Sequence, residues 1–134
     1  MRTSAAALVV VGAMIIGSTA AIDAAVRSDR RAIPGQMMSL TATAYCRHGQ
    51  TASGAHATSG IVAADPRVLP VGSILRIDAP EPYAGIYSVM DTGSRIKGRE
   101  IDIFVPDCAR AMRFGRRLVY VRVLRRGWDP KASE

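Results

Sequence analysis

The chain has 134 residues, of which 18 are basic and 11 acidic, so its formal net charge is +7. This length suits one small domain with a limited core, and the charge favours anionic partners such as nucleic acid, a membrane surface or a cell-wall polymer. Two His and two Cys are too scattered for a zinc site, and we expect neither a metal nor a cofactor.

Residues 1–21 have the pattern of a secretory signal peptide. Arg2 precedes the apolar run Ala5 to Ile16, and small residues follow it. The uncharged stretch 5–22 is about long enough to cross a bilayer, so an uncleaved membrane anchor is the alternative. We therefore expect an exported protein of the periplasm or cell envelope. Such a protein would not meet nucleic acid and would touch the membrane only through this segment.

Residues 22–38 show no amphipathic period, and we expect a flexible tether there. From Ser39 onward the chain consists of short alternating or apolar segments bounded by Gly or Pro. Six strands are expected, at 39–45, 60–64, 73–77, 85–90, 100–104 and 118–124, with one short α-helix between Pro106 and Gly115. This pattern predicts an all-β domain over residues 39–126, closed into a six-stranded barrel that hides every strand edge. We expect a monomer, with a C-terminal tail at 127–134.

The two cysteines, Cys46 and Cys108, are an even count in a chain expected to be exported, which favours a disulfide. The bond would close a loop of about 60 residues and tie the first strand to the helix, which is worth on the order of 4 kcal/mol. The alternative is a nucleophilic cysteine with His48 or His56 as its base. Neither histidine stands in a recognisable catalytic context, and an exported thiol tends to oxidise.

Arginines are concentrated near the C-terminus, at Arg113, Arg116, Arg117, Arg122, Arg125 and Arg126. Such a cluster favours a surface that faces a polyanion. A solvated surface that keeps a small protein soluble explains the same residues equally well.

Three aspartates stand in distinctive segments: Ala64-Asp65-Pro66, Asp91-Thr92-Gly93 and Ile101-Asp102-Ile103-Phe104. Together with Thr43-Ala44-Tyr45-Cys46, Thr51-Ala52-Ser53-Gly54 and Leu69-Pro70-Val71-Gly72, they give residues 40–124 an order of motifs that resembles the three-aspartate (3D) domain family. The resemblance implies a double-psi β-barrel related to the catalytic domain of membrane-bound lytic transglycosylase A, which acts on peptidoglycan glycan strands. Similar barrels in rare lipoprotein A and the expansins imply that the fold can also bind polysaccharide without cutting it.

Asp102 is the candidate catalytic acid/base. Ile101 and Ile103 alternate onto one face of their strand, so Asp102 points to the other, where partial burial or a nearby carboxylate would raise its pKa. The resemblance implies that its proton passes to the glycosidic oxygen of the β-1,4 bond between MurNAc and GlcNAc. The ionised carboxylate would then take the proton of the muramyl C6 hydroxyl, which closes a 1,6-anhydro-MurNAc ring. One acid/base suffices because the nucleophile is intramolecular.

The other two aspartates have structural alternatives. Asp91 would support Asp102 by a hydrogen bond or by its charge, or it would bond backbone amides in an Asp-Thr-Gly turn. Asp65 would complete the catalytic set, although Asp before Pro is typical of a cap on a short helical turn. The resemblance implies a glycan-binding groove lined by Thr43, Tyr45, Thr51, Ser53, Gly54 and Lys97.

Two alternative functions remain open. The first is a non-catalytic barrel that binds cell-wall polysaccharide. The second is an aspartic protease, because Val89-Met90-Asp91-Thr92-Gly93 fits the motif of that class. A single copy of the motif would require a homodimer to pair its carboxylates, and the sequence after Asp91 continues differently.

Overall fold

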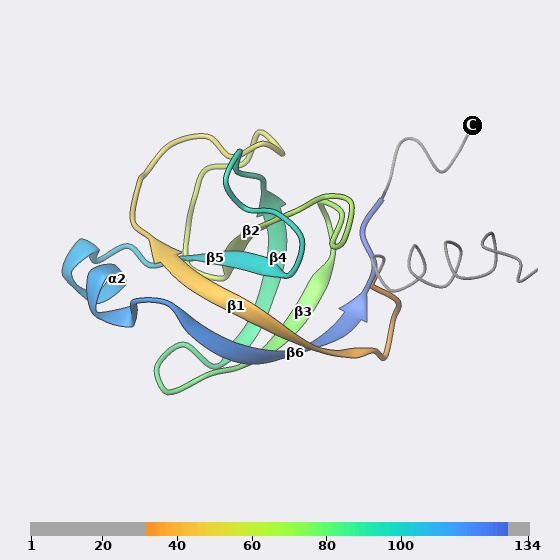
Figure 1. The fold of residues 1–134 in the computed structure, drawn as a ribbon. Coiled ribbons are helices and arrows are strands. Elements are labelled where there is room, and N and C mark those ends of the chain that lie inside the picture. The colour runs from red at the N-terminus through yellow and green to blue at the C-terminus, as the bar shows by residue number, and fades with distance from the viewer. Residues whose placement is uncertain (1–31, 129–134) are drawn as a thin grey trace, which may run out of the picture.

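The computed structural model describes residues 32–128, which fold into a closed barrel of six strands with one short helix (Figure 1). The expected signal segment, most of the tether and most of the tail lie outside these residues. In chain order the elements are β1 (Met37–Tyr45), β2 (Ile61–Ala64), β3 (Ile74–Asp78), β4 (Gly85–Asp91), β5 (Glu100–Phe104), α2 (Cys108–Phe114) and β6 (Arg117–Arg125). The predicted fold class is confirmed.

Strand order around the barrel is β1-β5-β2-β4-β3-β6, with β6 returning to β1. Two pairs are parallel, β1 with β5 and β2 with β4, and the other pairs are antiparallel. Strands that are distant in sequence therefore become neighbours, which is how the barrel brings motifs of separate segments together. Closure pairs both edges of each of the six described strands, so these strands offer no free edge to another chain.

The core follows from alternation along the strands. Val119, Val121 and Val123 of β6 are fully buried, while the residues between them are exposed. The same period of two buries one face of β1, β3 and β5. The barrel is thus filled by aliphatic side chains, and Asp102 falls on the opposite face of β5 from buried Ile101 and Ile103.

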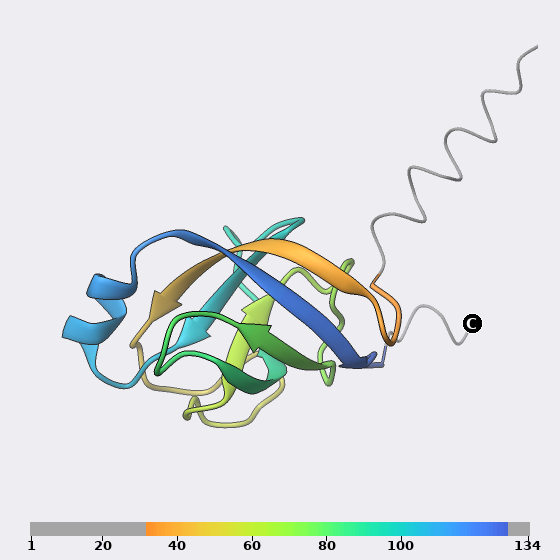
Figure 2. The same ribbon diagram turned by 90° about the horizontal axis from the view of Figure 1, so that it is seen from below.

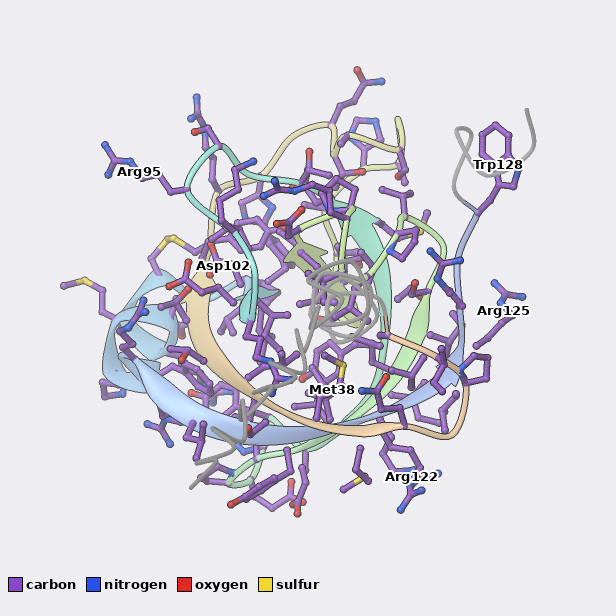
Figure 3. All side chains as sticks on the ribbon, turned by 45° about the vertical axis from the view of Figure 1, so that its right-hand side comes forward. Met38, Arg95, Asp102, Arg122, Arg125 and Trp128 are labelled. Carbon is purple, nitrogen blue, oxygen red and sulfur yellow. A yellow bond between two sulfur atoms is a disulfide. The ribbon has the colours of Figure 1, made fainter. Side chains whose placement is uncertain are left out.

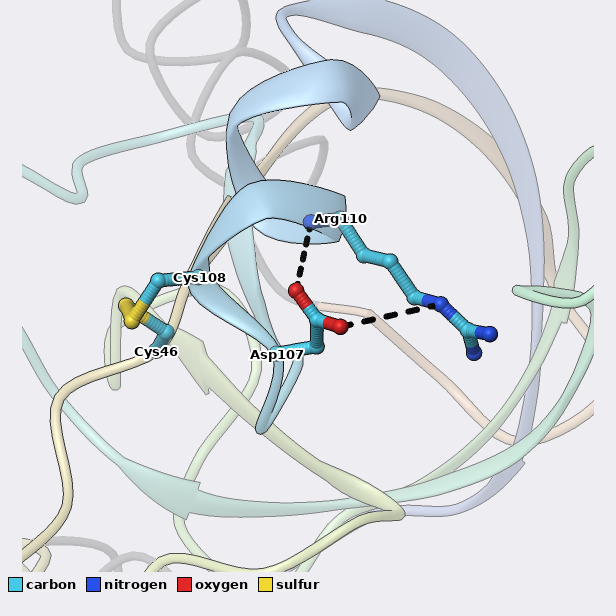
Figure 4. Close-up of a disulfide and its surroundings, with 4 residues drawn as sticks. All are labelled: Cys46, Asp107, Cys108 and Arg110. Atoms are coloured by element: carbon cyan, nitrogen blue, oxygen red, sulfur yellow. Dashed lines mark hydrogen bonds and ion pairs between the residues drawn. A yellow bond between two sulfur atoms is a disulfide. The ribbon is translucent and has the colours of Figure 1, made fainter.

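The short helix α2 covers one end of the barrel. Its N-cap is Asp107, whose carboxylate accepts a hydrogen bond from the Arg110 backbone at 3.0 Å, and Gly115 ends it at φ 66° (Figure 4). Phe114 is buried with its ring against Tyr83, at a centroid distance of 4.8 Å. A disulfide joins Cys46 to Cys108, so the predicted bond is confirmed, and both cysteines of the chain are in it.

The described chain enters and leaves the barrel at the end opposite α2, as two perpendicular views show (Figures 1 and 2). Gly35 donates its backbone N–H to the Val123 carbonyl at 2.8 Å, and Met37 pairs with Arg122. β1 begins two residues earlier than predicted, and Ala32 is fully buried. Residues 32–38, expected to end a flexible tether, are therefore packed on the barrel. Within residues 32–128, no helix has the length and apolarity that a membrane crossing requires.

Candidate functional site

A cleft of about 590 Å³ opens on one side of the barrel, between the loop 46–60 and the loop 92–99. Asp91 and Asp102 line it together with residues of both loops. The full lining is Tyr45, Arg47, His48, Gly49, Gln50, Thr51, Ala57, Ala63, Asp91, Thr92, Gly93, Ile96 and Asp102. Both loops rise from the same side of the ribbon in Figure 1.

Asp102 is a half-buried carboxyl held by the neighbouring strand. It lies in register with Thr43 of β1, whose hydroxyl donates a hydrogen bond to Asp102 Oδ1 at 2.9 Å. Burial raises the pKa of Asp102 above its ordinary value, the hydrogen bond from Thr43 opposes this, and the negative charge of Asp91 raises the pKa further. The carboxyl thus holds its proton more readily than a solvated aspartate does.

Asp91 reaches the same cleft through a β-bulge. Val62 of β2 pairs with Val89, but the next residue, Ala63, pairs with Asp91, so Met90 is an extra residue in β4. On its other side Ala63 pairs with Asp102 of β5. In a regular ladder Met90 would lie opposite Ala63, and Asp91 would point the other way. The bulge therefore places both carboxylates beside one alanine, whose small side chain leaves the space between them open.

Three donors fix the Asp91 carboxylate. The backbone N–H groups of Ala52 and Thr92 each donate to Oδ1 at 2.9 Å, and the Tyr45 hydroxyl donates to Oδ2 at 3.2 Å. Burial, followed by the charge of Asp91, raises the pKa of Tyr45, so the phenol remains a donor. Asp91 therefore binds one backbone amide of its own turn, that of Thr92, and one of the 46–60 loop, that of Ala52, and its charge acts on Asp102.

Asp65 does not line the cleft. Its side chain is buried and accepts four hydrogen bonds, three from the backbone and guanidinium of Arg67 and one from the Gly98 backbone at 2.8 Å. Burial alone would raise the pKa of Asp65, but these hydrogen bonds outweigh it and lower the pKa to about 2. The third aspartate thus fastens the 65–69 turn to the 92–99 loop, which forms one wall of the cleft.

The predicted groove residues divide into two groups. Tyr45 and Thr51 line the cleft, and Thr43 reaches Asp102. Ser53, Gly54 and Lys97 are not part of the lining. Ser53 instead shares a 2.9 Å hydrogen bond with Thr51, and Gly54 makes a turn at φ 87°.

Sequence reasoning did not assign Arg47, His48, Gln50, Ala63 and Ile96 to the site, although all line the cleft. The His48 ring lies edge-on to Phe104, at a centroid distance of 5.4 Å. His48 cannot activate Cys46, because that sulfur is in the disulfide. For two of these residues the sequence did offer a signal, because Arg47 and His48 directly follow the motif Thr43-Ala44-Tyr45-Cys46. Within residues 32–128, no cluster of His, Cys, Asp and Glu could hold a metal ion.

Comparison with known proteins connects this fold to cell-wall proteins. YabE of Bacillus subtilis (strain 168), named for cell wall shaping, is 35% identical over 99 residues, which are 67% of this chain and 23% of YabE. YocH of the same organism, a cell wall-binding protein, is 38% identical over 96 residues, 65% of this chain and 32% of YocH. This chain therefore spans less than a third of the length of these relatives.

Among solved structures, Escherichia coli MltA with bound chitohexaose aligns with a TM-score of 0.51 at 21% identity, over 60% of this chain and 28% of MltA. The Streptomyces papain inhibitor aligns with the same TM-score at 17% identity, over 69% of this chain and 97% of the inhibitor. These likenesses show the fold. The 3D domain model matches residues 60–125, which hold five of the six strands and α2, and this part of the chain is therefore a 3D domain.

Proposed function

We propose that this protein is a cell-envelope lytic transglycosylase that cleaves the β-1,4 bond between MurNAc and GlcNAc in peptidoglycan, with Asp102 as the acid/base. The observation that carries the proposal is the asymmetry of the two carboxyl groups in one cleft. Asp102 is half-buried with a raised pKa, whereas Asp91 is held by three donors. Two carboxyl groups whose surroundings differ in this way are suited to separate roles.

In the proposed reaction, protonated Asp102 donates its proton to the glycosidic oxygen as the bond to the muramyl anomeric carbon breaks. The ionised Asp102 then accepts the proton of the muramyl C6 hydroxyl, whose oxygen attacks that carbon and forms the 1,6-anhydro ring. The proton count balances, because Asp102 ends protonated and no water is consumed. Asp91 raises the proton affinity of Asp102 by its charge and favours the positive charge that develops on the sugar ring.

The relatives support the wall as the site of action. Two curated relatives are named for cell wall shaping and cell wall binding, and solved structures with this fold include the lytic transglycosylase MltA. An envelope location agrees with the disulfide, because such bonds persist in oxidising compartments.

The test is to incubate the full-length protein with purified peptidoglycan and to identify the soluble products by mass spectrometry. We expect anhydro-muropeptides from the native protein and none from Asp102→Asn. The matched control is Asp107→Asn, which removes an exposed carboxylate from the N-cap of α2 and retains a residue that caps helices well. Products with reducing ends would indicate hydrolysis and would overturn the proposed reaction.

The second candidate function is a non-catalytic wall-binding barrel, which the name of YocH favours. It predicts that peptidoglycan retains the protein on sedimentation without release of any product, and that Asp102→Asn leaves this retention unchanged. The aspartic protease alternative requires a second copy of the motif at Asp91, whereas the carboxylate that shares the cleft with Asp91 is Asp102, which stands in a different motif.

A further inference from the structure

A second cavity, of about 500 Å³, lies on the other side of the barrel. We call it the hairpin cavity because it lies where the β3–β4 hairpin meets β6 and the start of β1; its lining is Met37, Arg76, Ile77, Asp78, Glu81, Ala84, Gly85, Tyr120 and Arg122. The hairpin and the cleft loops project from opposite sides of the barrel in Figure 1. Figure 3 shows Arg122 pointing outward on the side away from Asp102. No residue is shared with the Asp102 cleft.

Two arginines lie directly opposite each other in this cavity. Arg76 of β3 pairs in register with Arg122 of β6. Like charges at opposed positions of a sheet repel and destabilise the pair. The Arg122 guanidinium donates to the Gly35 carbonyl at 3.4 Å, and neither arginine forms an ion pair within residues 32–128. A ligand anion placed between the two guanidinium groups would relieve this repulsion.

Two carboxylates line the same cavity. Asp78 ends β3, and Glu81 belongs to the hairpin loop that follows. Within the described residues neither forms an ion pair with the arginines. Four charged groups of both signs thus share one cavity without neutralising each other. A polyanion would be repelled by the carboxylates, whereas a zwitterion would match both signs.

Apolar surface completes the cavity. Met37 and Tyr120 are 51% and 53% exposed, and Tyr120 is in register with Asp78. An exposed aromatic ring beside charged groups provides a contact for the aliphatic part of a small ligand.

We propose that the hairpin cavity binds a short zwitterionic peptide. Its carboxylate lies between Arg76 and Arg122, its ammonium group faces Asp78 and Glu81, and its aliphatic part packs on Met37 and Tyr120. The choice of a peptidoglycan stem peptide among zwitterions rests on the proposed function. Because the two sites face opposite ways, the bound peptide belongs to a neighbouring glycan strand, and not to the strand in the Asp102 cleft.

The experiment titrates the full-length, isotope-labelled protein with stem peptides released from purified peptidoglycan by an amidase and follows backbone NMR shifts. We expect shifts at residues of the hairpin cavity. N-acetylation or methyl esterification of the peptide, each of which removes one sign of charge, should weaken binding by about tenfold or more. Equal binding of all three peptides, or shifts confined to the Asp102 cleft, would overturn the proposal.

Two double variants test the residues. Arg76→Gln with Arg122→Gln should abolish the discrimination between the free and esterified peptide, and Asp78→Asn with Glu81→Gln should abolish that between the free and acetylated peptide. All four side chains are exposed, so the fold should persist, and Arg113→Gln on exposed α2 is the matched control. Discrimination that survives the double variants contradicts the assignment.

Failure of this proposal is distinguishable from failure of the proposed function. Glycan strands stripped of peptide should bind the Asp102 cleft and yield anhydro products whether or not the hairpin cavity binds peptide. Peptide binding without anhydro products would retain this inference and reject the transglycosylase. The reverse result would reject the peptide site alone.

Discussion

Three aspartates in one chain acquire different properties from their surroundings. Asp102 faces a cleft and accepts one hydrogen bond from Thr43. Asp91 and Asp65 are surrounded by donors, and Asp65 is additionally buried beside a guanidinium group. Burial shifts the pKa of Asp102 toward the protonated form, which agrees with the role proposed for it.

Asp102→Asn should stabilise the fold at neutral pH. The raised pKa means that the fold disfavours the ionised carboxylate, so the contribution of this group to stability is full below its ordinary pKa of 3.8 and is lost as pH rises. The amide of the asparagine variant stays neutral as pH rises, so the variant avoids this loss of stability. The amide oxygen can still accept the hydrogen bond from Thr43. We expect the melting temperature at pH 7 to rise by a few degrees, on the order of 1 kcal/mol. A lower melting temperature at pH 7 would contradict this account of Asp102.

Thr43→Val should move the pH dependence of activity. The hydroxyl of Thr43 lowers the pKa of Asp102, so its removal raises that pKa further. The alkaline limb of the rate profile, where the acid loses its proton, should shift to higher pH. Thr41→Val, two residues earlier on the same face of β1, is the control and should leave the limb in place.

At the scale of elements, regular alternation was readable from the sequence and its interruption was not. The inward valines of β6 and the outward position of Asp102 follow from a period of two. The bulge at Met90 could not be predicted, because it appears only when β4 is paired with β2, which is distant in sequence. The position of Arg47 and His48 in the cleft could not be predicted either, because their loop is held by the hydrogen bond from the Ala52 backbone to Asp91.

Asp65 connects two such irregular elements, and its loss should be pH-dependent. The pKa of about 2 lies below the ordinary 3.8, so its stabilisation is present above about pH 4 and is lost as pH falls toward 2. Asp65→Asn should cost about 2 kcal/mol in urea unfolding at pH 7 and much less near pH 2. Asp107→Asn, with its exposed carboxylate, serves as control. An equal loss at both pH values would mean that shape, and not charge, explains the role of Asp65.

The disulfide joins the end of β1 to the start of α2, across 62 residues. Its removal by Cys46→Ala with Cys108→Ala should lower the free energy of unfolding by about 4 kcal/mol, since the loop it closes is long. Because Arg47 and His48 follow Cys46, the double variant should also show faster amide exchange at this wall of the cleft. Thiol titration of unfolded, unreduced protein should find no free thiol. Two free thiols would contradict the bond.

For the whole molecule, the barrel class could be predicted because closure is the usual solution for six short strands, whereas the distribution of charge could not. Three of the arginines near the C-terminus have separate partners. Arg116 pairs with Glu100 at 2.6 Å, Arg117 donates to the Phe114 carbonyl, and Arg125 reaches the Gly72 carbonyl. The surroundings of each arginine side chain depend on its position in or beside α2 and β6. Closeness of the arginines in the sequence does not reveal them.

The pairing of β1 with β6 determines how the barrel responds to pulling. Both described ends lie at the same end of this antiparallel pair (Figure 2), so force applied through the two termini meets hydrogen bonds that break one at a time, as in a zip. Force applied between the N-terminus and exposed Met112 of α2 would instead travel along the covalent path of β1 and the disulfide, which spares the β1–β6 hydrogen bonds. Single-molecule pulling should therefore record a lower unfolding force in the first geometry, and equal forces would contradict this load path. Tension between the two described ends would therefore open the β1–β6 seam first.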